Sequence, residues 1–527
     1  MRKTLASLLL CSTLLVPACT KRSRDAYVTE SAPVASGAVE EVASDYAAAG
    51  SAGPMAANGQ MVAMNQPRVT EGHGDNAFKD YGHNPWVDAS KDNLSTFAAD
   101  VDTASYTLAR RMLNESTLPP KAAIRVEEFV NYFSYTFPDP PGDSPFAVLM
   151  EAAPSPLSPG RHVLRVGVAT KAKSAQERKP ANLVFLVDVS GSMSGPDRIE
   201  LAKKSLRILT ANLIEGDTVS LVTYAGNTRV VLEPTGDKAK ILSALDDLQS
   251  GGSTGMASGI DLAYQQAMKG LRPGHISRVI ILSDGDANVG AHTHEELLKI
   301  IAGRVKEGVT LSTIGFGLGN YKDATMEQLA NKGNGNNFYV DSLDAAKKVF
   351  QEQIGSTLEV VAKDAKFQVD FDPKMVSRYR LVGYENRDIA DDSFRDDKVD
   401  AGEIGAGHQV TAMYEIELTA EGKQSTAPLG GVRIRHKAPT AEKATEAAFP
   451  MIGGVAASFA SSSHDFRFAF ATAAFADVLR GSTESEHWSL ADIRDMAQRA
   501  AGDDKERREM VSLVERTMQL TGRTAAR

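Results

Sequence analysis

The chain has 527 residues, too many for a single hydrophobic core, so several folding units are expected. Hydrophobic residues make up 42% of it and charged residues 24%, values that exclude both a wholly disordered chain and a multi-spanning membrane protein. The formal net charge of -9, with no basic stripe to offset it, argues against nucleic acid as a partner.

The N-terminus predicts a secretory signal peptide over residues 1–18. Arg2 and Lys3 precede the apolar run Leu5–Val16, which is too short to span a bilayer comfortably. The sequence Pro-Ala-Cys that ends at Cys19 resembles a bacterial lipobox. That resemblance implies a lipid on Cys19 and a place in the bacterial cell envelope, with outer-membrane sorting expected from Thr20. A plain secretory peptide and an uncleaved anchor are the alternatives.

Residues 19–83 are predicted to form a disordered tether. They are rich in Ala, Gly, Ser and Met and have almost no apolar periodicity. A small, poorly patterned domain is the alternative. Cleavage before Cys19 would remove Cys11, so the mature chain would have one cysteine and no internal disulfide.

Residues 84–145 are predicted to be an N-terminal helical region, because apolar residues recur at helical spacing over Asp102–Leu113 and Val126–Phe133. Residues 146–179 follow with two alternating, strand-like runs, Phe146–Glu151 and His162–Ala169.

The pattern over residues 180–355 predicts a doubly wound α/β domain of Rossmann-like architecture. Near-continuous apolar strands alternate with amphipathic helices, as in parallel sheets that are buried on both faces. The predicted strands are Leu183–Val187, Thr218–Tyr224, Val279–Ser283, Val309–Phe316 and Phe338–Val340.

Residues 356–445 return to alternating strands, which predict an antiparallel β domain flanking the α/β domain. Pairing of these strands with residues 146–170 would make the α/β domain an insertion in a β-sandwich. Residues 446–527 are predicted to be a C-terminal helical region that includes a helix over Asp465–Arg480.

Oxygen-bearing side chains are predicted to converge at the carboxyl edge of the α/β sheet, where such sheets bind ligands. Asp188, Ser190 and Ser192 follow the first strand, Thr254 precedes a helix, and Asp284 follows a later strand. Carboxylate and hydroxyl oxygens are hard ligands, so the expected cofactor is a divalent cation, Mg²⁺ first, with Mn²⁺ or Ca²⁺ as alternatives.

These five residues resemble the metal-ion-dependent adhesion site of the von Willebrand factor A-type family. The resemblance implies that Asp188, Ser190, Ser192, Thr254 and Asp284 hold the ion directly or through water. Outside this domain the chain resembles bacterial A-domain lipoproteins of the YfbK type. Four motifs carry that second resemblance: Ser95–Tyr106, Leu118–Pro120, Arg125–Phe133 and Asp465–Ala469.

The resemblance and the chemistry of the site together imply a binding protein rather than an enzyme. An open position on the ion would accept an acidic side chain of an unidentified protein ligand, and the lipid would hold the chain at a membrane. No catalytic residue is assigned, because no neighbouring His or Glu motif supplies a general acid or base. The alternatives are a structural scaffold for envelope assembly or stress response, and a metal-dependent envelope hydrolase.

Two competing motifs near Asp284 are weaker. The loop Asp284–Glu295 matches several positions of an EF-hand, but Val289 replaces the required glycine and a strand precedes the loop. His292 and His294 could suggest a zinc pair, yet no cysteine partners exist, so surface residues at the start of a solvated helix are expected.

Overall fold

The computed structural model describes most of the chain after the predicted tether. The described residues are 68–71, 77–99, 102–173, 177–225, 227–252, 255–285, 294–318, 321–353, 358–397, 399 and 401–522. The predicted signal peptide, Cys19 and the tether up to residue 67 lie outside this set. Among the described residues, no helix combines the length and the apolar character needed to cross a membrane.

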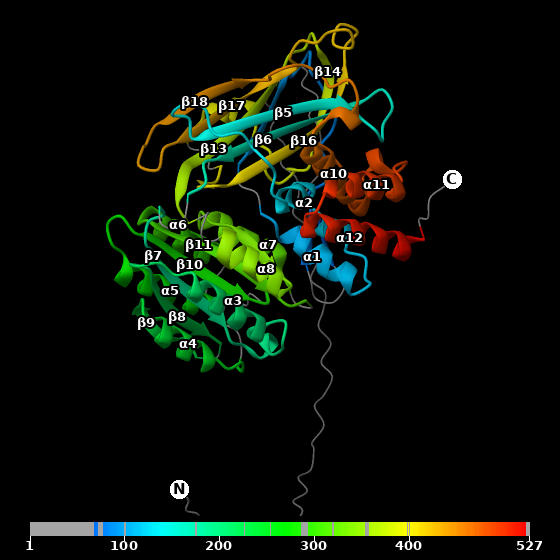
Figure 1. Ribbon diagram of the computed structural model, residues 1–527. Helices are drawn as coiled ribbons and strands as arrows, with labels where there is room; N and C mark the ends of the chain where they lie inside the picture. Colours follow the sequence, from blue (N-terminus) through cyan, green and yellow to red (C-terminus); the bar gives the residue numbers. More distant parts are fainter. Residues whose placement is uncertain are drawn as a thin grey trace, which may run out of the picture. The chain divides into compact units, whose positions relative to one another are not determined.

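The α/β domain is built on a six-stranded sheet in the order β12-β11-β10-β7-β8-β9 (Figure 1). Its strands are β7 (Ala181–Asp188), β8 (Thr218–Tyr224), β9 (Arg229–Thr235), β10 (Ile276–Ser283), β11 (Val309–Phe316) and β12 (Asn337–Val340). All neighbours are parallel except β8 and β9, which are antiparallel. Every residue of β7 is buried, as the continuous apolar pattern predicts for a central parallel strand.

Helices cover both faces of this sheet, so the predicted doubly wound architecture is confirmed. One apolar core joins the sheet to α3 (Ile199–Ala211), α4 (Lys238–Asp246) and α8 (Leu343–Lys347). The π-helical turn η3 (Lys348–Gln353) follows α8 directly. The opposite core joins the sheet to α5 (Met256–Gly270), α6 (His294–Lys306) and α7 (Asp323–Lys332).

The flanking β domain consists of two five-stranded sheets that share one core. The first has the order β3-β14-β16-β6-β5, from Val87–Asp88, Val376–Val382, Gln409–Leu418, His162–Thr170 and Phe146–Pro154. The second has the order β15-β13-β17-β18, from Ile404–Gly405, Val360–Phe371, Gly430–Lys437 and Ala444–Pro450, and β4 (Leu94–Ala98) also pairs with β13. Phe367 and Ile434 of one sheet lie in the same core cluster as Val166 and Tyr414 of the other.

Strands from before and after the α/β domain share a sheet. In β6, residues 162–169 pair antiparallel with residues 409–416 of β16. This is the pairing that an α/β domain inserted in a β-sandwich requires.

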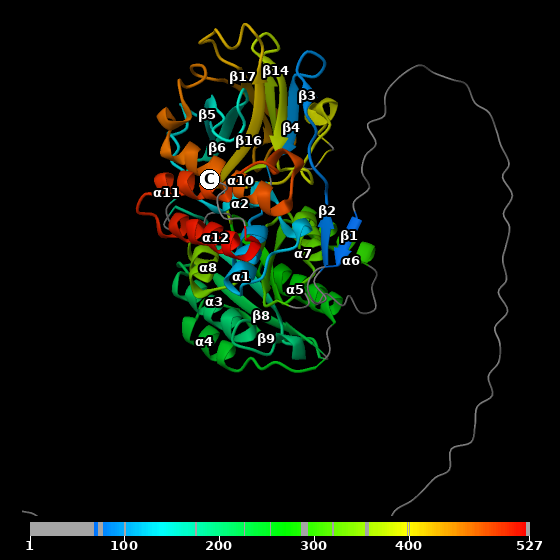
Figure 2. The same ribbon diagram turned by 90° about the vertical axis from the view of Figure 1, so that its right-hand side faces the viewer.

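A helical cluster joins the two ends of the described chain. It contains α1 (Ala104–Asn114), α2 (Val126–Tyr132), α10 (His464–Arg480), α11 (Leu490–Ala501) and α12 (Lys505–Thr521), which lie together in Figures 1 and 2. Phe129 of α2 packs edge-on against Tyr106 and Phe475. Helix α10 ends at Gly481, whose φ of 72° is the left-handed conformation common at helix C-termini. Short 3-10 turns span Lys121–Ala123 (η1), Gly191–Met193 (η2), Asp391–Arg395 (η4), Phe459–Ser461 (η5) and Thr483–Ser485 (η6).

Part of the predicted tether is ordered, which corrects its boundary at residue 83. The strands β1 (Arg68–Glu71) and β2 (Ala77–Asp80) pair as an antiparallel hairpin. Phe78 is buried in a cluster with Leu108 of α1 and Tyr321 of the α/β domain. The sequence does not reveal this order, because the buried Phe78 belongs to a short strand beside a long Ala- and Gly-rich stretch.

Two further boundaries are corrected. The predicted helical region 84–145 also contains β3 and β4, which belong to the β-sandwich. Strand β18 runs to Pro450 and therefore crosses the predicted boundary at residue 445. Its side chains are mostly exposed, so its sequence lacks the alternation of apolar and polar residues that marks a half-buried strand.

The β-sandwich should lose stability in mild acid through His408. Burial lowers the pKa of His408 from 6.5 to about 4, and its Nδ1 is enclosed without a hydrogen-bond partner among the described atoms. The unfolded chain binds a proton there below its ordinary pKa while the folded chain does not, so the free energy of unfolding should fall as the pH drops from 6.5 toward 4. We expect a loss of about 1–3 kcal/mol over that range.

The measurement is urea unfolding of the wild type and His408→Gln across this pH range. The glutamine variant should have a smaller pH dependence, since it has no titrating group at this position. Identical pH dependences of the two proteins would contradict the assignment.

Candidate metal site

The predicted site lies where three neighbouring strands of the α/β sheet end. Strand β7 ends at Asp188, β8 at Tyr224 and β10 at Ser283. Because β7 pairs with both β8 and β10 in parallel register, these three residues share one edge of the sheet. The loops after the strands therefore converge on Asp188.

Asp188 is fully buried and is held by hydrogen bonds to both carboxylate oxygens. Its Oδ1 accepts from the Ser190 backbone N–H at 2.9 Å. Its Oδ2 accepts from the Ser283 hydroxyl at 2.9 Å and from the Tyr224 hydroxyl at 3.1 Å. These three contacts fix the orientation of the carboxylate.

The two predicted serine ligands lie side by side. Ser190 Oγ and Ser192 Oγ are 2.9 Å apart, and η2 begins directly after Ser190. The backbone N–H of Gly191 donates to the Gly252 carbonyl at 3.1 Å, and that of Gly251 donates to the Val189 carbonyl at 2.6 Å. These bonds tie the serine loop to the glycine-rich loop that leads to Thr254. Thr254 itself lies outside the described residues.

Asp284 follows Ser283 and is almost fully buried. Arg198 connects the loop of Asp284 to two other loops. Its Nη1 lies 3.8 Å from Asp284 Oδ2 and also donates to the Ser192 carbonyl. Its Nη2 donates to the Leu318 carbonyl at 2.6 Å. Arg198 thus joins the loops that follow β7, β10 and β11.

The electrostatics of the site suit a hard cation. Burial raises the pKa of Asp188 to about 6, and the neighbouring Asp284 carboxylate also raises it. Two buried carboxylates with an adjacent pair of hydroxyls form a donor set that fits Mg²⁺, with water completing the shell. Within the described ranges, no three His, Cys, Asp or Glu side chains form a metal-binding group, so any ion here would depend on the serine hydroxyls.

The competing motifs are only partly described. Residues 286–293, which include most of the EF-hand-like loop and His292, lie outside the described residues. His294 begins α6, and its Nε2 lies 2.7 Å from Gln328 Oε1 on the exposed surface.

Three further residues of the site, Tyr224, Ser283 and Arg198, are not marked by any motif in the sequence. The first two end predicted strands, and the shared edge of those strands was the signal that could have placed them beside Asp188. No local pattern marks Arg198, because its partners Asp284 and Leu318 are distant in the sequence.

Family models match three consecutive parts of the chain. Residues 73–165 match "von Willebrand factor", residues 182–352 match "von Willebrand factor type A domain", and residues 356–520 match "Uncharacterized protein YfbK, C-terminal". The chain is also 38% identical over 465 residues to the uncharacterized protein YfbK of Escherichia coli (strain K12), covering 83% of this chain and 80% of that protein. The chain belongs to the YfbK-like family of bacterial von Willebrand factor type A proteins. This confirms the resemblance to A-domain proteins of the YfbK type.

One further relative and one solved structure match smaller parts of this YfbK-like protein. The uncharacterized protein sll0103 of Synechocystis sp. is 28% identical over 213 residues, covering 40% of this chain and 50% of that protein. Among solved structures, a von Willebrand factor type A protein from Catenulispora acidiphila is 17% identical and gives a TM-score of 0.39, covering 71% of this chain and 89% of the other.

The stability of the protein should depend on Gly317, which lies beside Arg198 at the rim of the site. Gly317 has a φ of 71°, and a Cβ there would clash with the Arg198 side chain at Nε. Since carbonyl contacts hold the guanidinium, the side chain cannot move away freely. We expect Gly317→Ala to lower the free energy of unfolding by about 1–3 kcal/mol.

Gly303→Ala is the matched control in chemical denaturation. Gly303 lies exposed within α6 with nothing near its Cβ position, so alanine should leave stability unchanged or raise it by about 0.5–1 kcal/mol. Equal effects of the two substitutions would contradict the proposed packing of Arg198.

Proposed function

We propose that this YfbK-like chain binds an acidic protein ligand through a divalent cation held at Asp188, Ser190, Ser192, Thr254 and Asp284. Mg²⁺ is the proposed ion. The observation that carries the proposal is the convergence of the buried carboxylates of Asp188 and Asp284 with the adjacent Ser190 and Ser192 hydroxyls.

The composition of this donor set favours recognition of a carboxylate. Hydroxyl ligands are neutral, so an ion held by two carboxylates and several hydroxyls keeps an affinity for a further negative ligand. An Asp or Glu side chain of a partner would satisfy that position. The position of Arg198, with Nη1 3.8 Å from Asp284 Oδ2, adds positive charge at the same rim.

Binding is favoured over hydrolysis by the neighbours of Asp188. Hydrolysis would need a general acid or base beside the activated water. The described neighbours of this carboxylate, Ser190, Tyr224 and Ser283, are hydrogen-bond donors that hold it in place. Their arrangement serves to position a ligand.

The proposal includes attachment to the bacterial cell envelope. A lipid on Cys19 would anchor the chain, and the Ala- and Gly-rich residues that follow would give the folded part reach from the membrane. An outer-membrane location rests on Thr20 after the lipidated cysteine.

Metal binding is tested by titrating Mg²⁺ and Mn²⁺ into the purified protein in a calorimeter. The wild type should bind one ion, and Asp188→Ala should abolish binding because it removes a buried anionic ligand. Asp247→Ala, an exposed carboxylate that caps α4, is the matched control and should leave affinity unchanged. Binding that persists in Asp188→Ala would refute the site.

Partner binding is tested by recovering proteins from envelope extracts with the lipid-anchored chain. A partner should be recovered with Mg²⁺ present, and both a chelator and Asp188→Ala should reduce its recovery at least tenfold, since the ion is the docking point. Unchanged recovery after chelation would contradict metal-dependent binding and would favour a scaffold role.

A further inference from the structure

Helix α1 lies between the helical cluster and the α/β domain (Figures 1 and 2). It contacts both α12 and β12, the edge strand of the six-stranded sheet. The side chain of Arg111 on this helix is only 14% exposed, because it reaches into the α/β domain. This arginine is the start of a chain of contacts that leads from α1 to the metal site.

Arg111 makes two hydrogen bonds to the α/β domain. Its Nη2 donates to Asp197 Oδ2 at 2.6 Å, and its Nη1 donates to the Tyr339 hydroxyl at 3.1 Å. Its Nε donates to Glu115 Oε1 at 3.0 Å, which holds the guanidinium against its own helix. Because the guanidinium is planar and its donors point in fixed directions, these bonds set the places of Asp197 and Tyr339 relative to α1.

The contact with Asp197 fixes the start of α3. Asp197 directly precedes Arg198, the N-cap residue of that helix. Burial alone would raise the pKa of Asp197, but the hydrogen bond and the charge of Arg111 outweigh burial and hold the pKa below its ordinary value. The pair is therefore formed by two ionised groups near neutrality, and it places the Arg198 backbone relative to α1.

The contact with Tyr339 fixes the carbonyl groups that hold the Arg198 side chain. The Tyr339 hydroxyl accepts from Arg111 and donates to the Gly317 carbonyl at 2.7 Å. The next carbonyl, that of Leu318, accepts from Arg198 Nη2 at 2.6 Å. Arg111 thus supports Arg198 twice, through its backbone and through the partners of its guanidinium.

Arg198 passes this support to the metal site. Its Nη1 donates to the Ser192 carbonyl and lies 3.8 Å from Asp284 Oδ2. Ser192 and Asp284 are two of the proposed ligands. A displacement of Arg198 would therefore move the serine loop and change the charge beside a ligand carboxylate.

A second attachment of the site to α1 is apolar. Gly285 directly follows Asp284, and a Cβ on it would lie 2.8 Å from Tyr321 Cα. Tyr321 is fully buried, and its ring centre lies 5.1 Å from that of Tyr339. It shares a core cluster with Leu108 of α1. The loop after β10 therefore packs on a core to which α1 contributes.

We propose that Arg111 is a positioning residue of the metal site, and that through it the affinity of the site for its ion depends on the place of α1. This inference rests on the proposed metal binding and adds a helix outside the α/β domain that regulates it. The proposed ligands all lie outside α1, so loss of Arg111 leaves the donor set complete and changes its geometry. By linkage, the bound ion should in turn strengthen the attachment of α1 to the α/β domain.

The test titrates Mg²⁺ into the full chain carrying Arg111→Met, in a calorimeter. The variant should still bind one ion, with an affinity about fivefold below that of the wild type. This is less than the roughly tenfold or greater loss that follows removal of a residue in direct contact with a metal ligand. Arg111→Lys keeps the charge beside Asp197 and should recover part of the affinity.

Arg507→Met is the matched control. Arg507 is 11% exposed and, like Arg111, it makes an ion pair, in this case with Asp465 at 2.7 Å. Its Nη2 also donates to the Ser134 carbonyl at 2.8 Å. These contacts lie within the helical cluster and its connecting loop. The control should lower the stability of the protein and leave the Mg²⁺ affinity within about twofold of the wild type.

Amide hydrogen exchange of the metal-free protein gives a readout that does not depend on the ion. The backbone N–H groups of Met193, Ser194 and Glu200 make local hydrogen bonds in the segment that Arg198 holds. They should exchange several times faster in Arg111→Met than in the wild type, because the support of Arg198 is lost. In Arg507→Met they should exchange at the wild-type rate.

The proposed function and the role of Arg111 fail in different ways. If Asp188→Ala abolishes Mg²⁺ binding while Arg111→Met binds like the wild type, the metal site stands and the role of Arg111 is overturned. Equal losses of affinity in Arg111→Met and Arg507→Met would also overturn it, as would unchanged amide exchange in Arg111→Met. Absence of Mg²⁺ binding to the wild type would refute both.

Discussion

The antiparallel pairing of β6 with β16 is the constraint on which the rest of the structure depends. It joins residues 162–169 to residues 409–416 across the whole α/β domain. The chain leaves and re-enters the β-sandwich at nearby points, since Lys173 before the α/β domain and Glu359 after it form an ion pair of 2.8 Å. The same closure brings α1 and α2, from before the insertion, into one core with α10, α11 and α12 from the end of the chain.

Buried ion pairs connect the inserted domain to the parts around it. Arg110 of α1 pairs with Asp341 at 2.6 Å, and both side chains are 5% exposed. Arg387, in the loop after β14, pairs with Asp102 at 2.9 Å and with Glu327 of α7 at 3.1 Å. Desolvation offsets much of the attraction in such pairs, so they contribute more to the specificity of docking than to net stability. Removing one partner would leave a buried charge without compensation.

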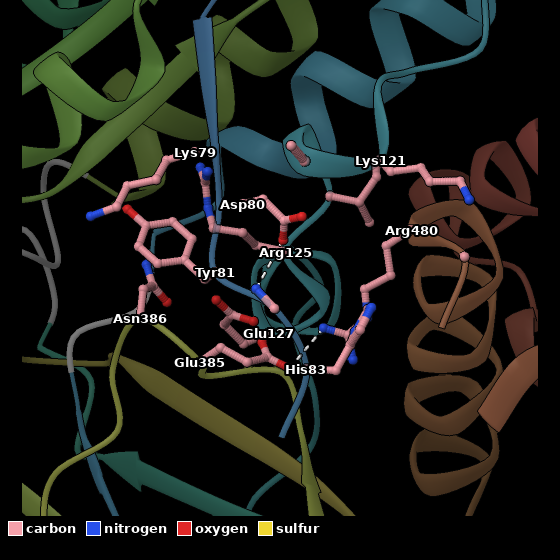
Figure 3. A pocket seen from close by; sticks show the side chains of 14 residues that line it. Lys79, Asp80, Tyr81, His83, Lys121, Arg125, Glu127, Glu385, Asn386 and Arg480 are labelled. Carbon is pink, nitrogen blue, oxygen red and sulfur yellow. Dashed lines mark hydrogen bonds and ion pairs between the residues drawn. The ribbon is translucent and has the colours of Figure 1, made fainter. Parts of the chain in front are cut away.

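The metal site and the cavity beside Arg480 (Figure 3) depend on this arrangement to different degrees. The metal site lies within the α/β domain, at an edge that any parallel sheet of this kind creates from its own strands. The cavity beside Arg480 needs β2, α2, the loop after β14 and α10 together. Its lining residues are unremarkable in the sequence, because they come from four separate parts of the chain.

The sequence alone determined the doubly wound domain and the positions of Asp188, Ser190, Ser192 and Asp284 at strand ends, since burial on both faces requires continuous apolar strands and parallel strands end at one edge. Only the tertiary structure decided that Tyr224, Ser283 and Arg198 support that edge, and that Phe78 orders part of the predicted tether. The physical reason is the same in each case. These contacts join residues far apart in the chain, and local periodicity carries no information about which distant side chains become neighbours.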